Sequence, residues 1–567
     1  MKIRIIALVL CLITVLPFVL AGCGSDEDIS NANQNDLTSR PTESVVIYMI
    51  KEEGTTDEDI AIVEKAFNEI TKSKFKTQVK LEFYTKDVYY EKLEEAMLKS
   101  KERKDALNNS YYEETTADPD AEVTEEETIL NEYGLPELKY PAFEDGQVDI
   151  FYFGGYNRYL DYTSIEKEWL VRLDSELSTS SKKLKDYIYP SFLKAAALSG
   201  KTYAIPNNNV IGEYTFLLLN KKLIDTYSYS ASDIMSMGDA MPFINDVMAN
   251  NKDEYDPIAY DSYKGAILTH YWSIDPEEIA VNSSEFSLVG SSYSIDATYG
   301  TVLSFASLFT RTAYTDQLKT LKYLQTNGYY AAEDSEKDFA VSMVKGGADV
   351  IEKYSDEYYV NIIDYPRATN EILYANMLGV SSFSLVETSR LMEIITYLNT
   401  NSDLRNLLQY GVENVHYVVN EDGKTITRVD DCGYIMDINK TGNVFMAYPE
   451  EGMSADVWKY AKIQNQDSKE AFFLKFNFSD TVDQPLNLEA IKAVQEASKE
   501  AAAELAAVES YDDFVAKLDE FAARYKASSP LLQKYLSPNR EGEDEKKYPY
   551  SQYYQWLLDN KFIVEEE

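Results

Sequence analysis

Apolar positions after Glu43 switch between two spacings, which predict alternating strands and helices. Residues 45–50 form an uninterrupted apolar run, which is typical of a buried strand. Over residues 60–70 apolar side chains recur at helical spacing, after polar residues that can start a helix. Apolar and polar residues then alternate over 79–83, which predicts a second strand.

The same alternation continues further along the chain. A second helix is expected around 89–97 and a third strand at 148–153. Strands that alternate with helices favour βαβ units and a parallel sheet. The segments 201–206 and 214–220 predict further strands, and we expect a second α/β lobe to begin there.

The rest of the chain combines helices with one hairpin. Helices are expected over 387–399 and 402–411, the second of which starts at a Ser and ends at a Gly. Segments 416–419 and 425–429 flank a polar turn with a Gly, which predicts a hairpin. Residues 487–525 are rich in Ala, Glu and Lys at helical spacing, so the C-terminal region is expected to be helical.

Residues 105–138 interrupt this pattern with eleven acidic residues and no Lys or Arg. We expect a solvated, mobile insertion. Its acidic stretch from Asp118 is similar to a calcium loop, but Val123 stands where glycine is required and Ile129 where a bidentate Glu is required. The sequence therefore favours an acidic loop without a metal.

The N-terminus has the pattern of a targeting segment. Lys2 and Arg4 precede the apolar run 5–20, and small residues then lead to Cys23, the acceptor pattern of bacterial lipoproteins. The run is short for a membrane span, which is the alternative interpretation. We therefore expect residues 1–22 to be a signal peptide and 23–42 to be a flexible linker that is lipidated at Cys23.

Charge and cysteine content exclude several classes of function. The chain has 54 Lys and Arg against 96 Asp and Glu, a formal net charge of −42. Such a charge repels phosphates, so nucleic acid is excluded as a main partner. It also repels anionic lipid head groups, so the protein needs a covalently attached lipid to stay at a membrane. After lipidation of Cys23, Cys432 is the only thiol left, which excludes a disulfide scaffold and a cysteine zinc site.

Signatures of an enzyme are weak in this sequence. Gly-Lys-Thr occurs at 200–202 and 423–425, but neither triplet has the glycine that a phosphate loop needs five residues earlier. The two histidines, His270 and His416, form no metal motif, and His416 is expected to be structural. We expect no catalytic residue and no cofactor. A glycosidase needs only two carboxylates, and with so many Asp and Glu residues such pairs occur by chance, so this class stays open.

Four segments resemble bacterial extracellular solute-binding lipoproteins that serve ABC importers, in the group that mostly handles carbohydrates. They are the lipobox at 20–23, the sequence GKTYAIPNN at 200–208 with the strand that follows, the stretch from Arg390 through LRNLLQYGVE to 417, and GNVFMAYP at 442–449. The likeness covers most of residues 45–460. Asn414 replaces the glycine that relatives usually have, and Asn tolerates the same turn.

The resemblance implies an α/β protein of the periplasmic-binding-protein type II fold. It would have two lobes with mixed sheets, hinge strands between them and a helical C-terminal region. The implied boundaries are 43–210 for lobe 1 with the insertion 105–138, 211–365 for lobe 2, 366–412 for a return to lobe 1, and 413–567 for lobe 2 with the C-terminal helices.

Ligands of open α/β sheets bind beyond the carboxyl ends of strands. A sugar site also needs aromatic faces and planar hydrogen-bonding groups. These two criteria select Lys51, Glu52, Tyr152, Gly154, Tyr156, Asn157, Asn207, Asn208 and Asn209. Trp272 is added because it is one of only four Trp residues and stands among polar neighbours, where a loop is expected. Arg367 is expected either to bind ligand or to form an ion pair between the lobes.

The expected function is capture of a sugar or oligosaccharide and its delivery to the permease of an ABC importer. The protein would lie on the extracellular face of the bacterial cytoplasmic membrane, attached by its lipid. Two alternatives remain open, namely a surface hydrolase that acts on glycans, and a sensor or adhesin with the same fold.

Overall fold

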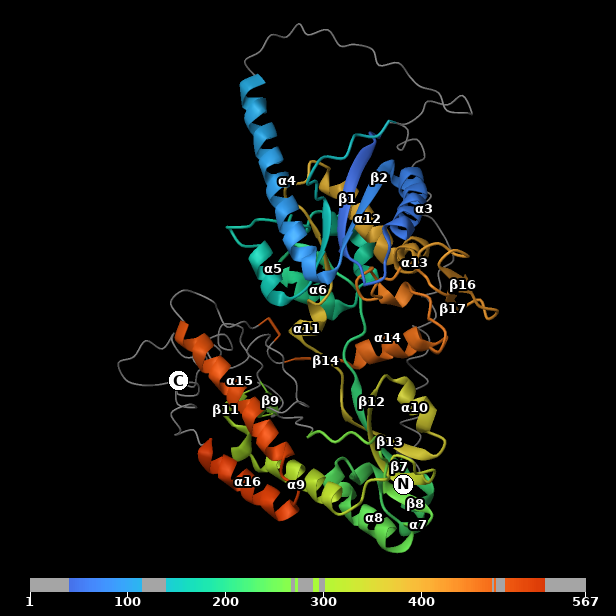
Figure 1. The fold of residues 1–567 in the computed structure, drawn as a ribbon, viewed down its shortest axis with the longest axis vertical. Coiled ribbons are helices and arrows are strands. Elements are labelled where there is room, and N and C mark those ends of the chain that lie inside the picture. Colours follow the sequence, from blue (N-terminus) through green and yellow to red (C-terminus); the bar gives the residue numbers. More distant parts are fainter. Residues whose placement is uncertain are drawn as a thin grey trace.

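The chain folds into two lobes, each built around one sheet (Figure 1). The computed structural model describes residues 40–114, 139–266, 271–273, 289–294, 301–471, 474–475 and 485–525. The signal segment, Cys23, His270 and residues 115–138 of the acidic insertion lie outside these ranges. Within them, no helix has the length and apolar character needed to cross a membrane.

Lobe 1 contains a five-stranded mixed sheet in the order β2-β1-β3-β15-β6. The strands are β1 (Glu43–Ile50), β2 (Thr77–Tyr84), β3 (Ile150–Phe153), β6 (Ala204–Pro206) and β15 (Met377–Val380). β1 runs parallel to β2 and β3, whereas β15 runs antiparallel to β3 and β6. Every residue of β3 and β15 is buried, as expected for central strands that helices cover.

Helices surround the sheet of lobe 1, and polar side chains cap the N-termini of some of them. Around the sheet lie α3 (Asp57–Phe75), α4 (Lys86–Glu114), α5 (Tyr156–Tyr162), α6 (Pro190–Ala196), α11 (Asn370–Leu373), α12 (Thr388–Thr400) and α13 (Ser402–Tyr410). Thr56 caps α3 by accepting a hydrogen bond from the Asp59 N–H at 3.1 Å. α4 continues to Glu114, so the first ten residues of the expected insertion are helical.

A buried carboxylate connects three parts of lobe 1. Asp149, directly before β3, accepts hydrogen bonds from the Val46 N–H at 2.8 Å, from Gln147 at 2.7 Å and from the Ser384 hydroxyl at 2.5 Å. The residue is 1% exposed. Burial raises the pKa of Asp149, while these three donors act in the opposite direction. The side chain therefore fixes the start of β3 against β1 and the loop after β15.

Lobe 2 contains a four-stranded sheet in the order β13-β7-β12-β8. Its strands are β7 (Tyr214–Asn220), β8 (Tyr255–Ile258), β12 (Asp338–Gly346) and β13 (Tyr358–Asp364). β7 is antiparallel to both of its neighbours. The surrounding helices are α7 (Lys221–Tyr227), α8 (Met237–Asn250), α9 (Thr312–Thr326) and α10 (Asp349–Tyr354).

The C-terminal helices lie with lobe 2 (Figure 1). They are α15 (Pro485–Ala506) and α16 (Tyr511–Arg524), and α16 packs on α9. The rings of Tyr323 and Tyr511 lie 5.5 Å apart, centroid to centroid. A separate sheet contains β9 (Tyr271–Ser273), β10 (Val289–Ser294) and β11 (Thr301–Ser307).

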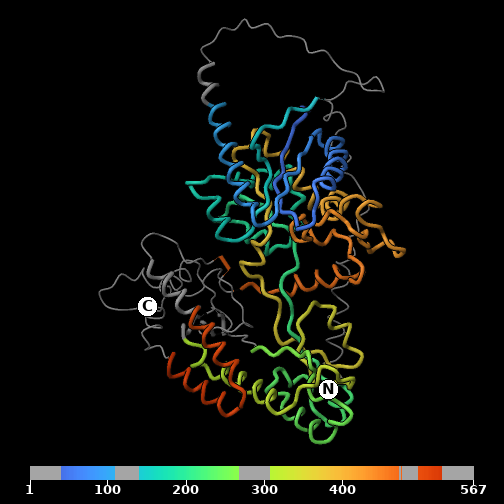
Figure 2. Tube along the Cα trace, viewed as in Figure 1, coloured from blue at the N-terminus to red at the C-terminus, as the bar shows by residue number. Residues whose placement is uncertain are grey.

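The chain crosses between the lobes in segments that lie side by side (Figure 2). Residues 207–213 lead from β6 to β7, and β13 returns through β14 (Arg367–Ala368). β14 pairs in parallel with β18 (Lys469–Glu470), which follows α14 (Val457–Asp467). Gly212 has a φ of 54°, and a Cβ there would meet the backbone nitrogen of Arg367 at 3.1 Å. This close crossing explains the glycine.

Residues 413–450, which the sequence assigned to lobe 2, pack on lobe 1 instead. They include the hairpin of β16 (Tyr417–Val419) and β17 (Ile426–Arg428). Tyr434 and Met436 belong to the lobe 1 core. The His416 Nε2 lies 3.1 Å from Asp59 Oδ1 on α3, and its Nδ1 accepts from the Val412 N–H at 2.8 Å. Sequence spacing does not show which lobe such contacts reach.

We expect the Asp149→Ala variant to lose about 3 kcal/mol of stability, because three donors would remain buried without an acceptor. Chemical denaturation followed by far-ultraviolet circular dichroism measures this loss. Asp145→Ala is the matched control, because that carboxylate lies at the surface with Lys99. Equal unfolding midpoints for the two variants would contradict the structural role of Asp149.

Candidate functional site

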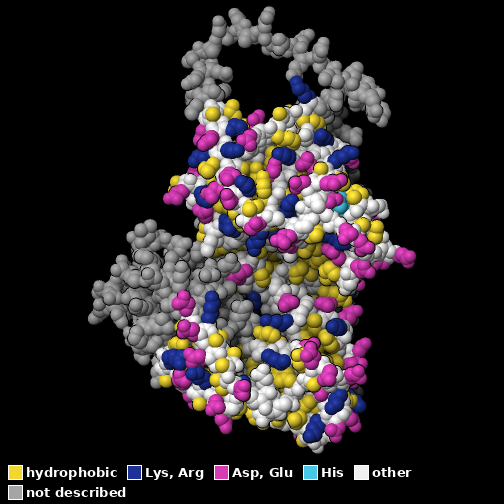
Figure 3. All heavy atoms as spheres, viewed as in Figure 1, with side chains coloured by type: hydrophobic (Ala, Val, Ile, Leu, Met, Phe, Trp, Pro, Cys, Tyr) yellow, Lys and Arg dark blue, Asp and Glu magenta, His cyan; other side chains and the backbone are white. Residues whose placement is uncertain are grey.

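Polar side chains gather where the strands of lobe 1 end toward the hinge. Glu52 follows β1, Tyr152 and Gly154 lie at the end of β3, and Asn207 follows β6. These strands share one sheet, so their ends meet at one edge. The structure thus places four of the residues that the sequence selected, Glu52, Tyr152, Gly154 and Asn207, at this edge. Figure 3 shows hydrophobic side chains, a class that here includes Tyr, gathered in the band between the two lobes.

An ammonium group lies between two carboxylates at this edge. Lys440 Nζ lies 2.7 Å from Glu52 Oε1 and 3.4 Å from Asp437 Oδ2. The Lys440 side chain is only 13% exposed, whereas Glu52 is 42% and Asp437 33% exposed. The two carboxylates can therefore accept further hydrogen bonds from solvent-side hydroxyl groups, and Lys440 compensates part of their charge.

Tyr152 lies at the centre of the group. Its hydroxyl is 2.8 Å from Asn376 Oδ1 and 3.1 Å from the carbonyl of Ala375. Burial is the main cause that raises the pKa of Tyr152. The carboxylates of Asp437 and Glu52 raise the pKa further, whereas the cationic Arg158 lowers it. The phenol therefore stays neutral and keeps its proton for hydrogen bonding.

Tyr90 and Arg158 form a second feature of the edge. The Arg158 guanidinium carbon lies 3.6 Å from the centre of the Tyr90 ring, a cation–π arrangement. Arg158 also donates to the carbonyl of Gly154 at 2.5 Å, which fixes it to the end of β3. Burial raises the pKa of Tyr90, and the neighbouring Arg158 and Lys440 lower it. Both side chains are partly exposed and can contact a ligand.

The three crossover asparagines are buried and hold other chain segments. Asn207 and Asn209 both donate to the carbonyl of Asn439, at 3.0 and 3.4 Å. Asn208 accepts from the Tyr189 N–H at 2.9 Å and donates to the carbonyl of Tyr187 at 2.9 Å. Both the oxygen and the nitrogen of the Asn208 side-chain amide are therefore hydrogen-bonded to protein groups.

The other selected residues are more scattered. Lys51 reaches the carbonyl of Thr55 at 3.0 Å and Asp57 at 3.3 Å. The Tyr156 hydroxyl donates to the carbonyl of Lys475 at 2.8 Å, and Asn157 is exposed on α5.

Arg367 and Trp272 lie away from the strand ends of lobe 1. Arg367 forms an ion pair with Asp364 at 2.8 Å, within the returning hinge strand. Trp272 lies in β9, where its backbone pairs with Ser291, and not in the loop that the sequence indicated. Its side chain lies outside the described residues.

The buried polar face of α13 positions the loop that carries Asp437 and Lys440. Arg405 donates to the carbonyl of Ile438 at 2.8 Å, and Gln409 donates to the carbonyl of Met436 at 2.6 Å. Burial lowers the pKa of Arg405 to about 10, so it remains a cation at neutral pH. These residues belong to the LRNLLQYGVE segment, and their contacts give that segment a physical role.

Sequence reasoning missed several members of the group. They are Tyr90, Arg158, Asn376, Asp437, Asn439 and Lys440. The strand-end rule selects residues directly after a strand. Tyr90 and Arg158 lie on helices, Asn376 directly precedes β15, and the other three belong to a loop that lies far away in sequence. The polar residues on the buried face of α13 could have indicated the loop, because buried polar side chains need hydrogen-bond partners from another part of the chain.

No protein-family model and no curated protein matches the chain. The crystal structure of the N-glycan transport solute binding protein of Streptococcus pneumoniae has a similar fold, with a TM-score of 0.52 at 17% identity over 92% of this chain and 100% of that chain. An extracellular solute-binding protein of Bifidobacterium longum subsp. infantis gives 0.42 at 12% identity, over 87% and 97% of the two chains.

The first of these similarities extends over 92% of this chain, which is more than one lobe. Both lobes and the hinge are therefore compared in it, and the mixed sheets, hinge strands and C-terminal helices agree with the fold predicted from the sequence. The chain has the two-lobed α/β fold of bacterial solute-binding proteins.

Proposed function

We propose that this protein captures a sugar or oligosaccharide at the cell surface and delivers it to the permease of an ABC importer. The observation that carries the proposal is the polar and aromatic group at the hinge edge of lobe 1, within a two-lobed fold. The Streptococcus protein with the similar fold is named for N-glycan transport, which supports the same class of solute.

The group has the chemistry that a sugar requires. Glu52 and Asp437 offer carboxylate oxygens to hydroxyl groups, and such charge-assisted bonds are stronger than neutral ones. Lys440 and Arg158 supply donors, and the partly exposed ring of Tyr90 can contact the C–H side of a sugar ring. A solute held here also meets lobe 2, so its binding favours the closed arrangement of the lobes.

Solute release without chemical change distinguishes this function from its alternatives. A glycan hydrolase on the same fold would shorten an oligosaccharide during incubation, and chromatography of the recovered sugar detects this. A sensor or adhesin would bind sugar without any need for a permease. Capture for import is favoured because the hinge permits a bound solute to be enclosed and then released.

Attachment to the membrane through Cys23 is part of the proposal. The motif Leu20-Ala21-Gly22-Cys23 supports it. The net charge of −42 would repel anionic head groups, so the acyl chains supply the attraction. The protein would then work on the outer side of the bacterial cytoplasmic membrane.

Calorimetric titration with a panel of oligosaccharides should identify a tight ligand, and Glu52→Gln should weaken that ligand about tenfold or more. The reason is the loss of a charge-assisted hydrogen bond, worth about 1.5–3 kcal/mol. Glu53→Gln is the matched control, because Glu53 is exposed next to Glu52 and has no place in the group.

Two results would count against this proposal in different ways. Binding of no saccharide at all would contradict the function. Tight binding that Glu52→Gln leaves unchanged would keep the function but move the site elsewhere.

We expect Cys23→Ala to leave the protein soluble or uncleaved, because the acyl chains are the only strong membrane attraction of the acidic mature body. Immunoblots of detergent-free membrane and soluble fractions measure the change. Cys432→Ala serves as the control and should stay with the membrane. Full retention of Cys23→Ala would show that the anchor lies elsewhere.

A further inference from the structure

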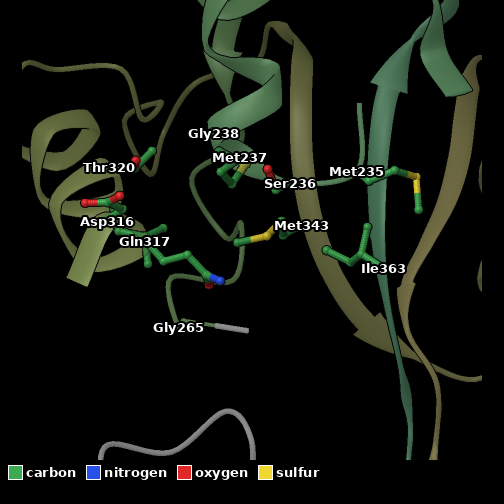
Figure 4. Close-up of a pocket in the computed structure, with 11 residues that line it drawn as sticks. Met235, Ser236, Met237, Gly238, Gly265, Asp316, Gln317, Thr320, Met343 and Ile363 are labelled. Carbon is green, nitrogen blue, oxygen red and sulfur yellow. The ribbon is translucent and has the colours of Figure 1, made fainter. Parts of the chain in front are cut away.

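Lobe 2 contains a cavity of about 290 Å³, and none of its lining residues belongs to the polar group on lobe 1 (Figure 4). It lies between the sheet, the start of α8 and the first half of α9. Its lining residues are Met235, Ser236, Met237, Gly238, Gly265, Asp316, Gln317, Thr320, Leu321, Met343 and Ile363.

The cavity lies at the end of the lobe 2 sheet from which the chain leads to the hinge. Ile363 is the residue before Asp364, where β13 ends, and Met343 lies three residues before the end of β12. β13 runs toward lobe 1, because it leads into β14. β12 runs in the same direction, because both strands are antiparallel to β7. A solute held between the lobes can therefore extend toward the cavity.

One wall of the cavity is apolar. Met237 and Met343 belong to the lobe 2 core and line the interior, and Ile363 lies at its edge. Figure 4 shows the thioether of Met343 between Gln317 and Ile363. Methionine is flexible and polarisable, so such a wall accommodates a small apolar group without a fixed shape.

The opposite wall is polar. Asp316 and Thr320 stand one turn apart on α9 and so share a face, with Gln317 beside them. A carboxylate accepts a hydrogen bond, whereas a hydroxyl and a carboxamide can also donate. The cavity therefore suits a group that has an amide-like polar side and an apolar side.

We infer that this cavity binds the acetamido group of an N-acetylated sugar residue. This inference rests on the proposed function and adds the class of solute. An acetamido methyl fits the methionine wall, its N–H can donate to Asp316, and its carbonyl can accept from Thr320 or Gln317. A plain hexose has no comparable apolar substituent. A cavity of about 150 Å³ holds benzene, so this larger one has room for the acetamido group with part of its ring.

Titration with N,N′-diacetylchitobiose and cellobiose tests the inference, because the two disaccharides share ring and linkage and differ in the acetamido groups. The parent protein should bind the acetylated disaccharide at least about tenfold more tightly, the scale set by one well-placed apolar group. Ile363→Phe, which fills the cavity, should abolish the preference, so that the two disaccharides bind about equally.

Two further variants keep the test independent of folding defects. Ile351→Phe is the matched control, because Ile351 is exposed on α10, and it should keep the full preference. Thr320→Val changes a partly exposed helical position and should reduce the preference severalfold.

The possible outcomes separate this inference from the proposed function. Equal binding of the two disaccharides, or a preference that survives in folded Ile363→Phe, overturns the inference. The same holds if neither disaccharide binds while another saccharide does, and in all three cases sugar capture still stands. If no saccharide binds, the proposed function fails and the inference fails with it.

Discussion

Hydrogen bonds from the crossover asparagines join parts of the chain on which both the hinge and the site depend. Asn207 and Asn209 reach the carbonyl of Asn439, 232 and 230 residues away in sequence. The carbonyl of Asn209 accepts from Asn465 on α14, 256 residues away. The first segment to leave lobe 1, residues 207–213, is thus tied both to the loop that carries Lys440 and to the helix beside the hinge.

This arrangement lets one region be rigid while the lobes move. α14 contacts both lobes, since the Trp458 indole donates to the carbonyl of Ala447 at 2.7 Å and the Tyr214 hydroxyl of β7 donates to Asp467 at 2.7 Å. The buried bonds around Asn439 place Asp437 and Lys440 next to Glu52 before any solute arrives. A prearranged binding surface loses less conformational entropy on binding.

The sequence predicted part of the strands and helices, those on which burial imposes a clear regular spacing; it predicted none between residues 221 and 386, where α8, α9, β12 and β13 lie. β1, β7 and the α12–α13 pair lie where the apolar pattern placed them. The pattern was less informative where polar contacts decide the structure. The 413–450 segment packs on lobe 1 through His416, Tyr434 and Met436, and only the folded chain shows which residues those groups meet. The strand-end rule selected Glu52 and Tyr152 because they lie at the ends of strands, whereas the positions of Asp437 and Lys440 depend on hydrogen bonds from α13 to their loop.

The central claim is that a solute draws the two lobes together around the hinge edge of lobe 1. Small-angle X-ray scattering of the mature protein, measured without solute and then saturated with the tightest saccharide, tests it most directly. The account predicts a smaller radius of gyration at saturation and no change with a saccharide that does not bind. An unchanged radius of gyration at proven saturation would contradict it.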